Sequence, residues 1–385
     1  MTAIAGLSGL RPSPAAVARI TVPPYDVIKP GSALEKLLSG NPDSLWHVTL
    51  GPDPVAALKR LGGSVLVEDT EPSFYVYEQI WAGGRRLGVF AAVEVTPYAQ
   101  GQVIRHEKVF DDKVQGRLKL TRATGLTLEP VFLLTRSAIT PVLESIAKTQ
   151  APLYAFTSDF AGESELHAIA NRFWRVPQAS ADGQRLVSLV ATNPLYIADG
   201  HHRYHAALLG GQSHAMAYVV EQAGIQAYNR VVNGVVRFSE IQKQLTLEPL
   251  PRFATPPKNA FTLYHQGKAW LLRAKQVPAD VVGRLDCSIL ERELYPLLGL
   301  EHAMIKDAKH FDYYPEQDLA RMTAVVDRGD YDLAIALHPV SIDELIAVAD
   351  AGRSDSNVVM PEKSTFFAPK ILSGVMLYRH RPRGG

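Results

Sequence analysis

Short apolar strands alternate with amphipathic helices along most of this chain, and this alternation limits the folds that it can adopt. Strand-forming runs at Phe74–Ile80 and Leu87–Val95 flank a pair of glycines, which predicts a β-hairpin. Helical spacing of apolar residues is found at Ile139–Lys148, Glu163–Trp174, Gly183–Thr192, Cys287–Tyr295, Gln317–Asp327 and Ser341–Ala351. The pattern predicts an α/β or α+β protein in which helices flank mixed sheets.

The length of 385 residues corresponds to two or three globular units. Proline and polar residues gather near 135–141 and near 249–257, and these are the candidate boundaries. We therefore predict three regions: an N-terminal α/β region at 1–135, a histidine-rich region at 136–250, and a C-terminal α/β region at 251–385.

The charge balance excludes several kinds of partner. The chain has 40 Lys and Arg residues against 39 Asp and Glu residues, so no global field attracts nucleic acid or an anionic membrane. No run approaches the ~20 apolar residues of a transmembrane helix, and the first ten residues do not resemble a secretory signal. We predict a cytoplasmic protein whose partner is a small anionic ligand or nucleotide. The sequence does not indicate an oligomeric state.

The most informative motif is the segment 198–205, ADGHHRYH, which lies between an apolar run at 195–198 and a helical stretch. Strand, turn and helix in this order place Asp199 and Gly200 on the turn and His201, His202 and Arg203 in the first helical turn. A helix N-terminus binds anions through unpaired N–H groups, and an arginine grips phosphate with two donors. The motif predicts a phosphate site.

The same residues allow two metal sites. Asp199, at the end of the strand, could hold Mg²⁺ or accept the proton of a substrate hydroxyl. Alternatively, His201 and His205 lie four residues apart on one helical face and could bind Zn or Fe together with Asp199. Both alternatives stay open at this point.

Two further polar motifs lie in the N-terminal region. The segment 105–108, RHEK, combines Arg105, His106, Glu107 and Lys108, which could bind a phosphate and move a proton, or could form a solvated charged face. The segment 23–28, PPYDVI, places Asp26 on a stiff stretch, either as a catalytic acid or as a turn residue.

A fourth polar motif is the segment 360–370, MPEKSTFFAPK, a proline-stiffened stretch near the C-terminus. Its donors for phosphate oxygens are Lys363, Ser364, Thr365 and Lys370, although a plain surface loop would look the same. The sequence has no Walker phosphate loop, dinucleotide fingerprint or nucleophile elbow, which disfavours the enzymes built on those motifs.

These four motifs, in this order, resemble those of the bacterial and archaeal family named domain of unknown function 1015. One departure is Asn229, where the family tends to have histidine, so a proton-transfer role at that position is doubtful. The segment from Asp199 to Arg203 also resembles the phosphate-binding strand–turn–helix of the ParB/sulfiredoxin-like superfamily, which includes free serine kinases. This second resemblance implies that Asp199, His201, His202 and Arg203 handle nucleotide phosphates and a substrate hydroxyl.

From the residues and the resemblance together we predict a phosphotransferase. It would move a phosphoryl group from a nucleotide or pyrophosphate to a small hydroxylated metabolite such as a serine-like amino acid, with Mg²⁺ as cofactor. Two alternatives are a metal-dependent hydrolase or lyase that uses Asp199, His201 and His205, and a nucleotide-binding switch without catalysis. We also expect the four motifs to converge on one site.

Overall fold

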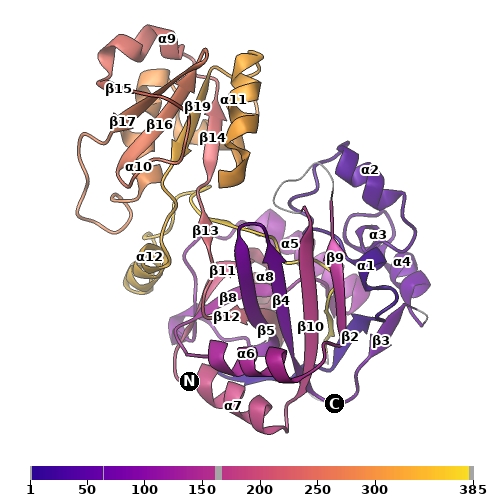
Figure 1. Cartoon of the computed structure of the whole chain (residues 1–385). Coiled ribbons are helices and arrows are strands. Elements are labelled where there is room, and N and C mark those ends of the chain that lie inside the picture. Colours follow the sequence, from indigo (N-terminus) through magenta and orange to yellow (C-terminus); the bar gives the residue numbers. More distant parts are fainter. Residues whose placement is uncertain (1, 64, 161–166, 381–385) are drawn as a thin grey trace. The chain divides into compact units, whose positions relative to one another are not determined.

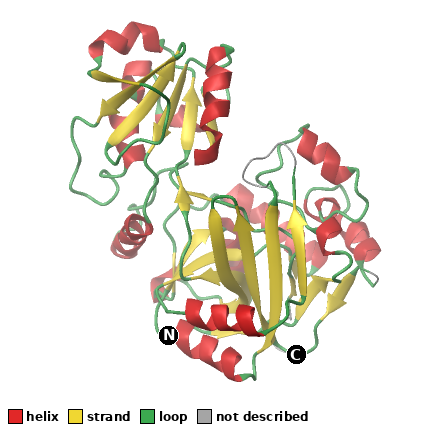
Figure 2. Cartoon of the chain, viewed as in Figure 1, coloured by secondary structure: helices red, strands yellow, loops and turns green. Residues whose placement is uncertain are grey.

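The computed structural model describes residues 2–63, 65–160 and 167–380, and its chain forms two compact units (Figure 1). Unit 1 contains residues 1–223 together with 369–385, and unit 2 contains residues 224–368. The chain thus leaves unit 1 once and returns to it near the C-terminus. Both units combine strands with helices, which confirms the predicted mixed α/β class (Figure 2). Within the described ranges, none of the helices has the length and apolar character needed to cross a membrane.

A mixed sheet forms the centre of unit 1. Its strands are β1 (Ile4–Ala5), β4 (Ser73–Trp81), β5 (Gly84–Glu94), β6 (Val103–Ile104), β8 (Val131–Thr135), β9 (Tyr154–Ser158), β10 (Ile169–Pro177), β11 (Leu195–Asp199) and β12 (His214–Val220). The order is β6-β11-β8-β12-β5-β4-β10-β9, with β1 beside β5. The pairs β6–β11 and β8–β12 are parallel, and the other described pairs are antiparallel.

The predicted hairpin is confirmed as β4 and β5. Trp81 pairs with Gly84, so Ala82 and Gly83 form a two-residue loop. Gly84 has a φ of +147°, a conformation that residues with a side chain rarely adopt. The glycine pair therefore fixes both the position of the turn and the register of the hairpin.

Both faces of this hairpin are covered, which explains why apolar residues run almost continuously along it. On one face, α6 (Thr140–Thr149) and α7 (Ala181–Val190) pack their apolar sides against Val89, Ala91 and Val93. Aromatic rings form a separate cluster, in which Phe90 lies 5.2 Å from Tyr218 between ring centroids. A strand buried on both faces gains from apolar residues at every position.

A second sheet of unit 1 joins both ends of the chain. Its strands are β2 (Gly9–Pro12), β3 (Leu66–Glu68), β7 (Leu126–Thr127) and β21 (Leu377–Arg379), in the order β3-β2-β21-β7. The helices α1 (Val17–Ile20), α2 (Ala33–Ser39), α3 (Trp46–Thr49) and α4 (Pro54–Leu61) lie between β2 and β3 along the chain. Because β21 pairs with β2, the returning C-terminal segment is an integral part of unit 1.

Unit 2 has its own sheet and core. The strands β14 (Asn229–Val232), β15 (Leu247–Leu250), β16 (Ala260–His265), β17 (Lys268–Arg273), β18 (Phe311–Tyr314) and β19 (Leu333–Leu337) follow the order β15-β17-β16-β19-β14-β18. The short strands β13 (Ile225–Gln226) and β20 (Phe366–Phe367) pair separately. The helices are α9 (Phe238–Ile241), α10 (Asp286–Glu293), α11 (Leu319–Asp327) and α12 (Ile342–Ser354). Leu263, Leu290 and Ile335 are fully buried in the core of this unit.

One predicted helix is wrong. The range Glu163–Trp174 lies partly outside the described residues, and its described part is mostly strand β10, which pairs with β4 from Ala170 to Pro177. Isoleucine, phenylalanine, tryptophan and valine favour strands. The pairing of β10 with both β4 and β9 outweighed the helical spacing of the apolar residues in this range. The other five predicted helices are confirmed as α6, α7, α10, α11 and α12.

The two units do not coincide with the three regions predicted at 1–135, 136–250 and 251–385. Strands from the first two regions share one sheet, since β12 pairs with both β5 and β8. The end of the chain belongs to unit 1 and not to the unit that precedes it in sequence. Sheet pairing between distant segments leaves no local mark in composition.

Candidate phosphate-binding site

The segment 195–209 forms the predicted strand, turn and helix. Strand β11 ends at Asp199, and α8 (His201–Leu209) begins two residues later with Gly200 as its N-cap. Gly200 has a φ of +93°, and a Cβ at this position would lie 3.0 Å from Nε of Arg203. Because the N-cap residue is a glycine, it has no side chain that could accept from the first N–H groups of the helix. The turn therefore presents N–H groups of the first helical turn beside an arginine, which is the local geometry of an anion site.

Positive charge surrounds the carboxylate of Asp199. Its Oδ2 accepts a hydrogen bond from Nη2 of Arg203 at 2.9 Å, and Nη1 of Arg203 donates to the carbonyl of Pro130. Burial alone would raise the pKa of Asp199, but Lys370, Arg203 and His201 together hold this pKa below its ordinary value. The side chain of Arg203 is only 14% exposed. Asp199 is therefore a carboxylate that stays ionised in a positive environment.

Lys370 reaches this site from the returning C-terminal segment. The carbonyl of Lys370 accepts a hydrogen bond from Gln79 at 3.1 Å, and Arg86 donates to the carbonyl of Pro369. Both donors lie on the β4–β5 hairpin, so the sheet fixes the backbone that carries this lysine. The predicted convergence of Lys370 with Asp199 is thus present within unit 1.

The RHEK motif lies beside the turn because two strands run parallel. Strand β6 pairs with β11 so that Val103 lies opposite Leu195 and Ile104 opposite Tyr196. The residues that follow each strand therefore leave the sheet at the same edge. This register brings His106 next to His201, with ring centroids 4.5 Å apart and planes at 84°.

Three side chains form a compact cluster at this edge. Nδ1 of His201 lies 3.3 Å from Oε2 of Glu107, and Nε2 of His106 lies 3.8 Å from Oε1 of the same carboxylate. The backbone N–H of His106 donates to Nε2 of His201 at 3.3 Å. Because that backbone group can only donate, the neutral His201 ring carries its proton on Nδ1 and directs it to Glu107.

Burial shifts the protonation of all three groups. It lowers the pKa of His106 and that of His201 to about 3 each, so both rings are neutral at pH 7. Burial of the carboxyl group also raises the pKa of Glu107 above its ordinary value. The side chain of Glu107 nevertheless remains 39% exposed. The cluster is thus a carboxylate of increased basicity that solvent can reach, held between two neutral imidazoles.

Other predicted residues lie around this centre. His202 stacks on Phe110 just before α5 (Asp111–Thr124), with centroids 5.9 Å apart. His205 stacks on Tyr98 at an interplanar angle of 4°, and the guanidinium of Arg105 lies 4.9 Å from the centroid of the same tyrosine. His205 is therefore directed toward Tyr98.

The remaining predicted residues of unit 1 are exposed. Burial lowers the pKa of Arg203, but the charges of Asp199, Glu129 and Asp26 raise it further than burial lowers it. Asp26 therefore lies close enough to Arg203 to contribute to this shift. Lys108 is exposed on the loop after β6. Sequence reasoning missed Glu129, a buried carboxylate whose Oε1 accepts from the hydroxyl of Ser373 at 2.8 Å. Only its position beside Pro130, at the start of a strand, could have drawn attention to it.

Three predicted residues belong to unit 2. Lys363 has a φ of +57°, and its Nζ lies 5.4 Å from the ring centroids of both Tyr228 and Tyr313. Oγ of Ser364 is buried without a hydrogen-bond partner among the described residues, and Thr365 is half-buried. The 360–370 motif is therefore divided between the two units. Convergence of these three residues on Asp199 stays a prediction.

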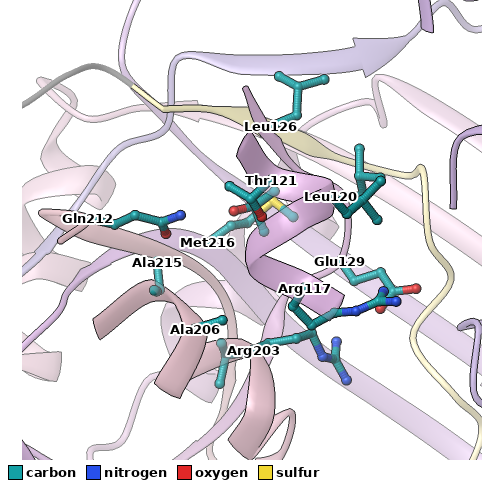
Figure 3. Close-up of a pocket in the computed structure, with 14 residues that line it drawn as sticks. Arg117, Leu120, Thr121, Leu126, Glu129, Arg203, Ala206, Gln212, Ala215 and Met216 are labelled. Atoms are coloured by element: carbon teal, nitrogen blue, oxygen red, sulfur yellow. The ribbon is translucent and has the colours of Figure 1, made fainter. Parts of the chain in front are cut away.

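Arg203 lines a small pocket between α5 and α8. Figure 3 shows Arg117, Arg203 and Glu129 gathered on one side of it and apolar or neutral side chains around the rest. The guanidinium of Arg117 lies 3.8 Å from the ring centroid of Tyr25, so the PPYDVI segment also reaches this end of the pocket.

The donor atoms distinguish two kinds of metal. Asp199 offers carboxylate oxygen, which Mg²⁺ prefers, and therefore fits the predicted magnesium role. Across the part of the chain that the structure describes, three potential ligands gather at His106, Glu107 and His201, with ligand atoms within 4.8 Å of one another. Asp199 and His205 are not in that group, so the structure assembles a different set from the predicted Asp199, His201 and His205.

Comparison with solved structures finds distant similarities. A free serine kinase in complex with AMP is 15% identical and a variant in complex with ADP is 14% identical, each with a TM-score of 0.38, covering 75% of this chain and 92% of theirs. SbnI from Staphylococcus aureus, with a C-terminal truncation, is 14% identical with a TM-score of 0.37, covering 74% of this chain and 85% of its own. These TM-scores are too low for the likeness to indicate a shared activity.

No curated protein matches the sequence. The model of one protein family does match, over residues 4–288, which is well over half of the chain. That family is described as "Protein of unknown function (DUF1015)", and the matched residues include three of the four polar motifs, at 23–28, 105–108 and 198–205. The chain therefore belongs to the DUF1015 family of proteins of unknown function.

Proposed function

We propose that this protein is a small-molecule phosphotransferase whose active site lies in unit 1. The donor would be a nucleotide or pyrophosphate, and the acceptor a small hydroxylated metabolite such as a serine-like amino acid. The observation that carries the proposal is the position of Asp199. This ionised carboxylate is paired with Arg203 and stabilised by the charge of Lys370, and it directly precedes a helix whose N-cap is Gly200.

The positive groups supply what phosphoryl transfer needs most, which is positioning and neutralisation of charge. Backbone N–H groups of the first turn of α8 would bind donor phosphate oxygens. Arg203 would add its fork of donors, of which Asp199 and Pro130 engage one nitrogen each. Lys370 would approach as a point charge from the returning segment.

Glu107 would act as the general base. Its carboxylate is exposed enough to meet an acceptor hydroxyl, and burial raises its pKa toward the range useful for catalysis. The γ-phosphoryl group would pass to the acceptor oxygen, the nucleoside diphosphate would leave, and the hydroxyl proton would move to Glu107. His201 would orient the base, because its Nδ1–H faces Oε2 of Glu107.

Asp199 fits a second role as a ligand of the predicted Mg²⁺, since carboxylate oxygen suits this ion. Bound magnesium would neutralise charge on the donor phosphates. Asp199 would also keep Arg203 in place through the 2.9 Å ion pair.

The experiment that tests the proposal separates binding from turnover. Calorimetry with ATP, ADP and pyrophosphate in the presence of Mg²⁺ identifies a donor, and phosphorus NMR with serine and other hydroxylated metabolites detects a new phosphomonoester. Arg203→Ala should weaken donor binding by roughly 10- to 100-fold, which corresponds to a lost charged hydrogen-bond donor. Arg353→Ala, at an exposed arginine of α12, is the control and should bind normally.

Glu107→Gln tests the chemical step. The amide keeps the shape of the side chain but cannot take a proton, so binding of the donor should persist while turnover falls by at least about 100-fold. Donor binding without turnover in the unmodified protein, across the acceptor panel, would reduce the proposal to a nucleotide-binding module. Unchanged donor binding in Arg203→Ala would remove the proposed phosphate site.

A further inference from the structure

The cluster of His106, Glu107 and His201 has a composition that phosphoryl transfer alone does not require. One carboxylate would serve as a base, and one imidazole would suffice to orient it. The cluster instead contains a second imidazole, and potential ligand atoms of all three side chains lie within 4.8 Å of one another. The three residues lie two or three positions after the ends of two adjacent parallel strands, so the pairing of these strands brings them together.

The environment of His106 gives an independent indication. Its side chain is completely buried, and neither ring nitrogen has a hydrogen-bond partner of normal geometry among the described residues, although the carbonyl of Ile197 is near. A buried polar atom without a partner destabilises the folded protein. Nε2 of His106 faces the carboxylate of Glu107 at 3.8 Å, a separation that leaves the nitrogen unsatisfied. A ligand between these side chains would satisfy it.

The donor set indicates which ligand this is. Two imidazole nitrogens and one carboxylate oxygen bind Zn²⁺, Co²⁺ and related d-block cations, which take three protein ligands and leave a position for water. Mg²⁺ prefers a set made of oxygen atoms, so this cluster would discriminate against it. The partial exposure of Glu107 provides the path by which an ion and its water can enter.

We infer that His106, Glu107 and His201 form a binding site for a divalent d-block cation such as Zn²⁺. To bind it through Nε2, His201 exchanges only the 3.3 Å hydrogen bond from the backbone of His106 for a metal–nitrogen bond, and its Nδ1–H stays directed at Glu107. An occupied site removes Glu107 from proton transfer, so the cation inhibits the proposed phosphotransferase. This last consequence rests on the proposed function, whereas the binding does not.

Direct titration with metal ions tests the site without any assay of turnover. Full-length protein, freed of metal by a chelator, is titrated with CoCl₂ while the visible d–d absorption is recorded, and ZnCl₂ is then added. We expect one equivalent of Co²⁺ to give intense bands typical of four- or five-coordination, and Zn²⁺ to abolish them. Saturation without such bands, or only weak binding of several equivalents, would overturn the inference.

Three variants assign the ligands. His106→Ala and Glu107→Gln should each weaken Co²⁺ binding by at least about 10-fold, because each removes one ligand of three. His205→Ala is the matched control, because His205 lies on α8 with His201 but stacks on Tyr98. This variant should bind Co²⁺ as tightly as the unmodified protein. If His106→Ala does not fold, Glu107→Gln alone decides, because its side chain is partly exposed. Unchanged binding in Glu107→Gln, or loss of binding in His205→Ala, would refute the assignment.

A second titration concerns inhibition. If the phosphotransferase activity is found, ZnCl₂ should inhibit it over the same concentration range in which it displaces Co²⁺. Cobalt binding without activity would leave the metal site standing and refute only the proposed function. Activity that survives full occupancy of the site would show that the cation does not remove the base.

Discussion

Replacing Gly200 with alanine tests the phosphate-binding turn while leaving its charged side chains in the sequence. The new Cβ would lie 3.0 Å from Nε, 3.1 Å from Cζ and 3.3 Å from Nη2 of Arg203. These atoms are the mobile end of a long side chain, so the guanidinium would move and the protein would still fold. Movement of the guanidinium breaks the alignment with Asp199 that places Arg203 at the helix N-terminus.

The magnitude follows from two separable terms. An alanine at a φ of +93° is strained, and such a residue costs about 1–3 kcal/mol of stability. Displacement of Arg203 removes a charged donor from the phosphate site, which should weaken donor binding by roughly 10- to 100-fold. Urea unfolding measures the first term, and calorimetric titration with the nucleotide measures the second.

Gly211, at the other end of the same helix, provides a matched control. Its φ is +66°, and a Cβ there would have no atom within 4 Å. Gly211→Ala should therefore lose about 1–2 kcal/mol of stability from backbone strain and retain normal donor binding. If both variants bind the donor normally, or if both lose binding equally, the reasoning about Gly200 and Arg203 is refuted.

Two further predictions concern stability. Asp69→Asn should lower the free energy of unfolding by about 3–5 kcal/mol in a urea titration, because it leaves the buried Arg11 without the carboxylate that lies 2.7 Å away. Burial raises the pKa of Asp69, but hydrogen bonds from Arg11 and Tyr75 outweigh it and hold this pKa below 3.8. The stabilisation is therefore present above pH 3.8 and is lost as the pH falls below that value. If the stability of Asp69→Asn fell with acid as steeply as that of the unmodified protein, this explanation would be contradicted. Burial lowers the pKa of His380 to about 4, so the unfolded chain binds the proton more strongly than the folded chain does. The free energy of unfolding should therefore decrease as the pH is lowered from 6.5 to 4. His380→Gln should reduce that dependence in thermal melts at different pH, and an unchanged slope would refute the assignment.

Local chemistry could be predicted from the sequence where it depends on neighbours in the chain. The hairpin follows from two strand-forming runs around two glycines, and the turn at Gly200 follows from an apolar run, a glycine and a helix start. Each of these elements depends only on residues that are close together in the sequence.

Contacts between distant segments could not be predicted in this way. Strand β6 has two residues and strand β11 has five, and neither sequence indicates that the two pair in parallel. Yet this pairing brings His106 and Glu107 to His201, so that His106, and not His205, is the second histidine of the cluster. The return of the C-terminal segment to unit 1 places Lys370 in a different unit from Lys363, although the two are only seven positions apart in the sequence. The missed Glu129 is notable only through its buried contacts in the folded protein.

The central claim is that donor phosphates bind at the turn between β11 and α8. A crystal structure of the full chain with Mg²⁺ and a non-hydrolysable ATP analogue tests it most directly. The account predicts phosphate oxygens within hydrogen-bond distance of the backbone N–H groups at the start of α8, with the guanidinium of Arg203 and the ammonium of Lys370 on the same phosphates. A nucleotide bound elsewhere, with Arg203 still paired only to Asp199 and Pro130, would contradict it.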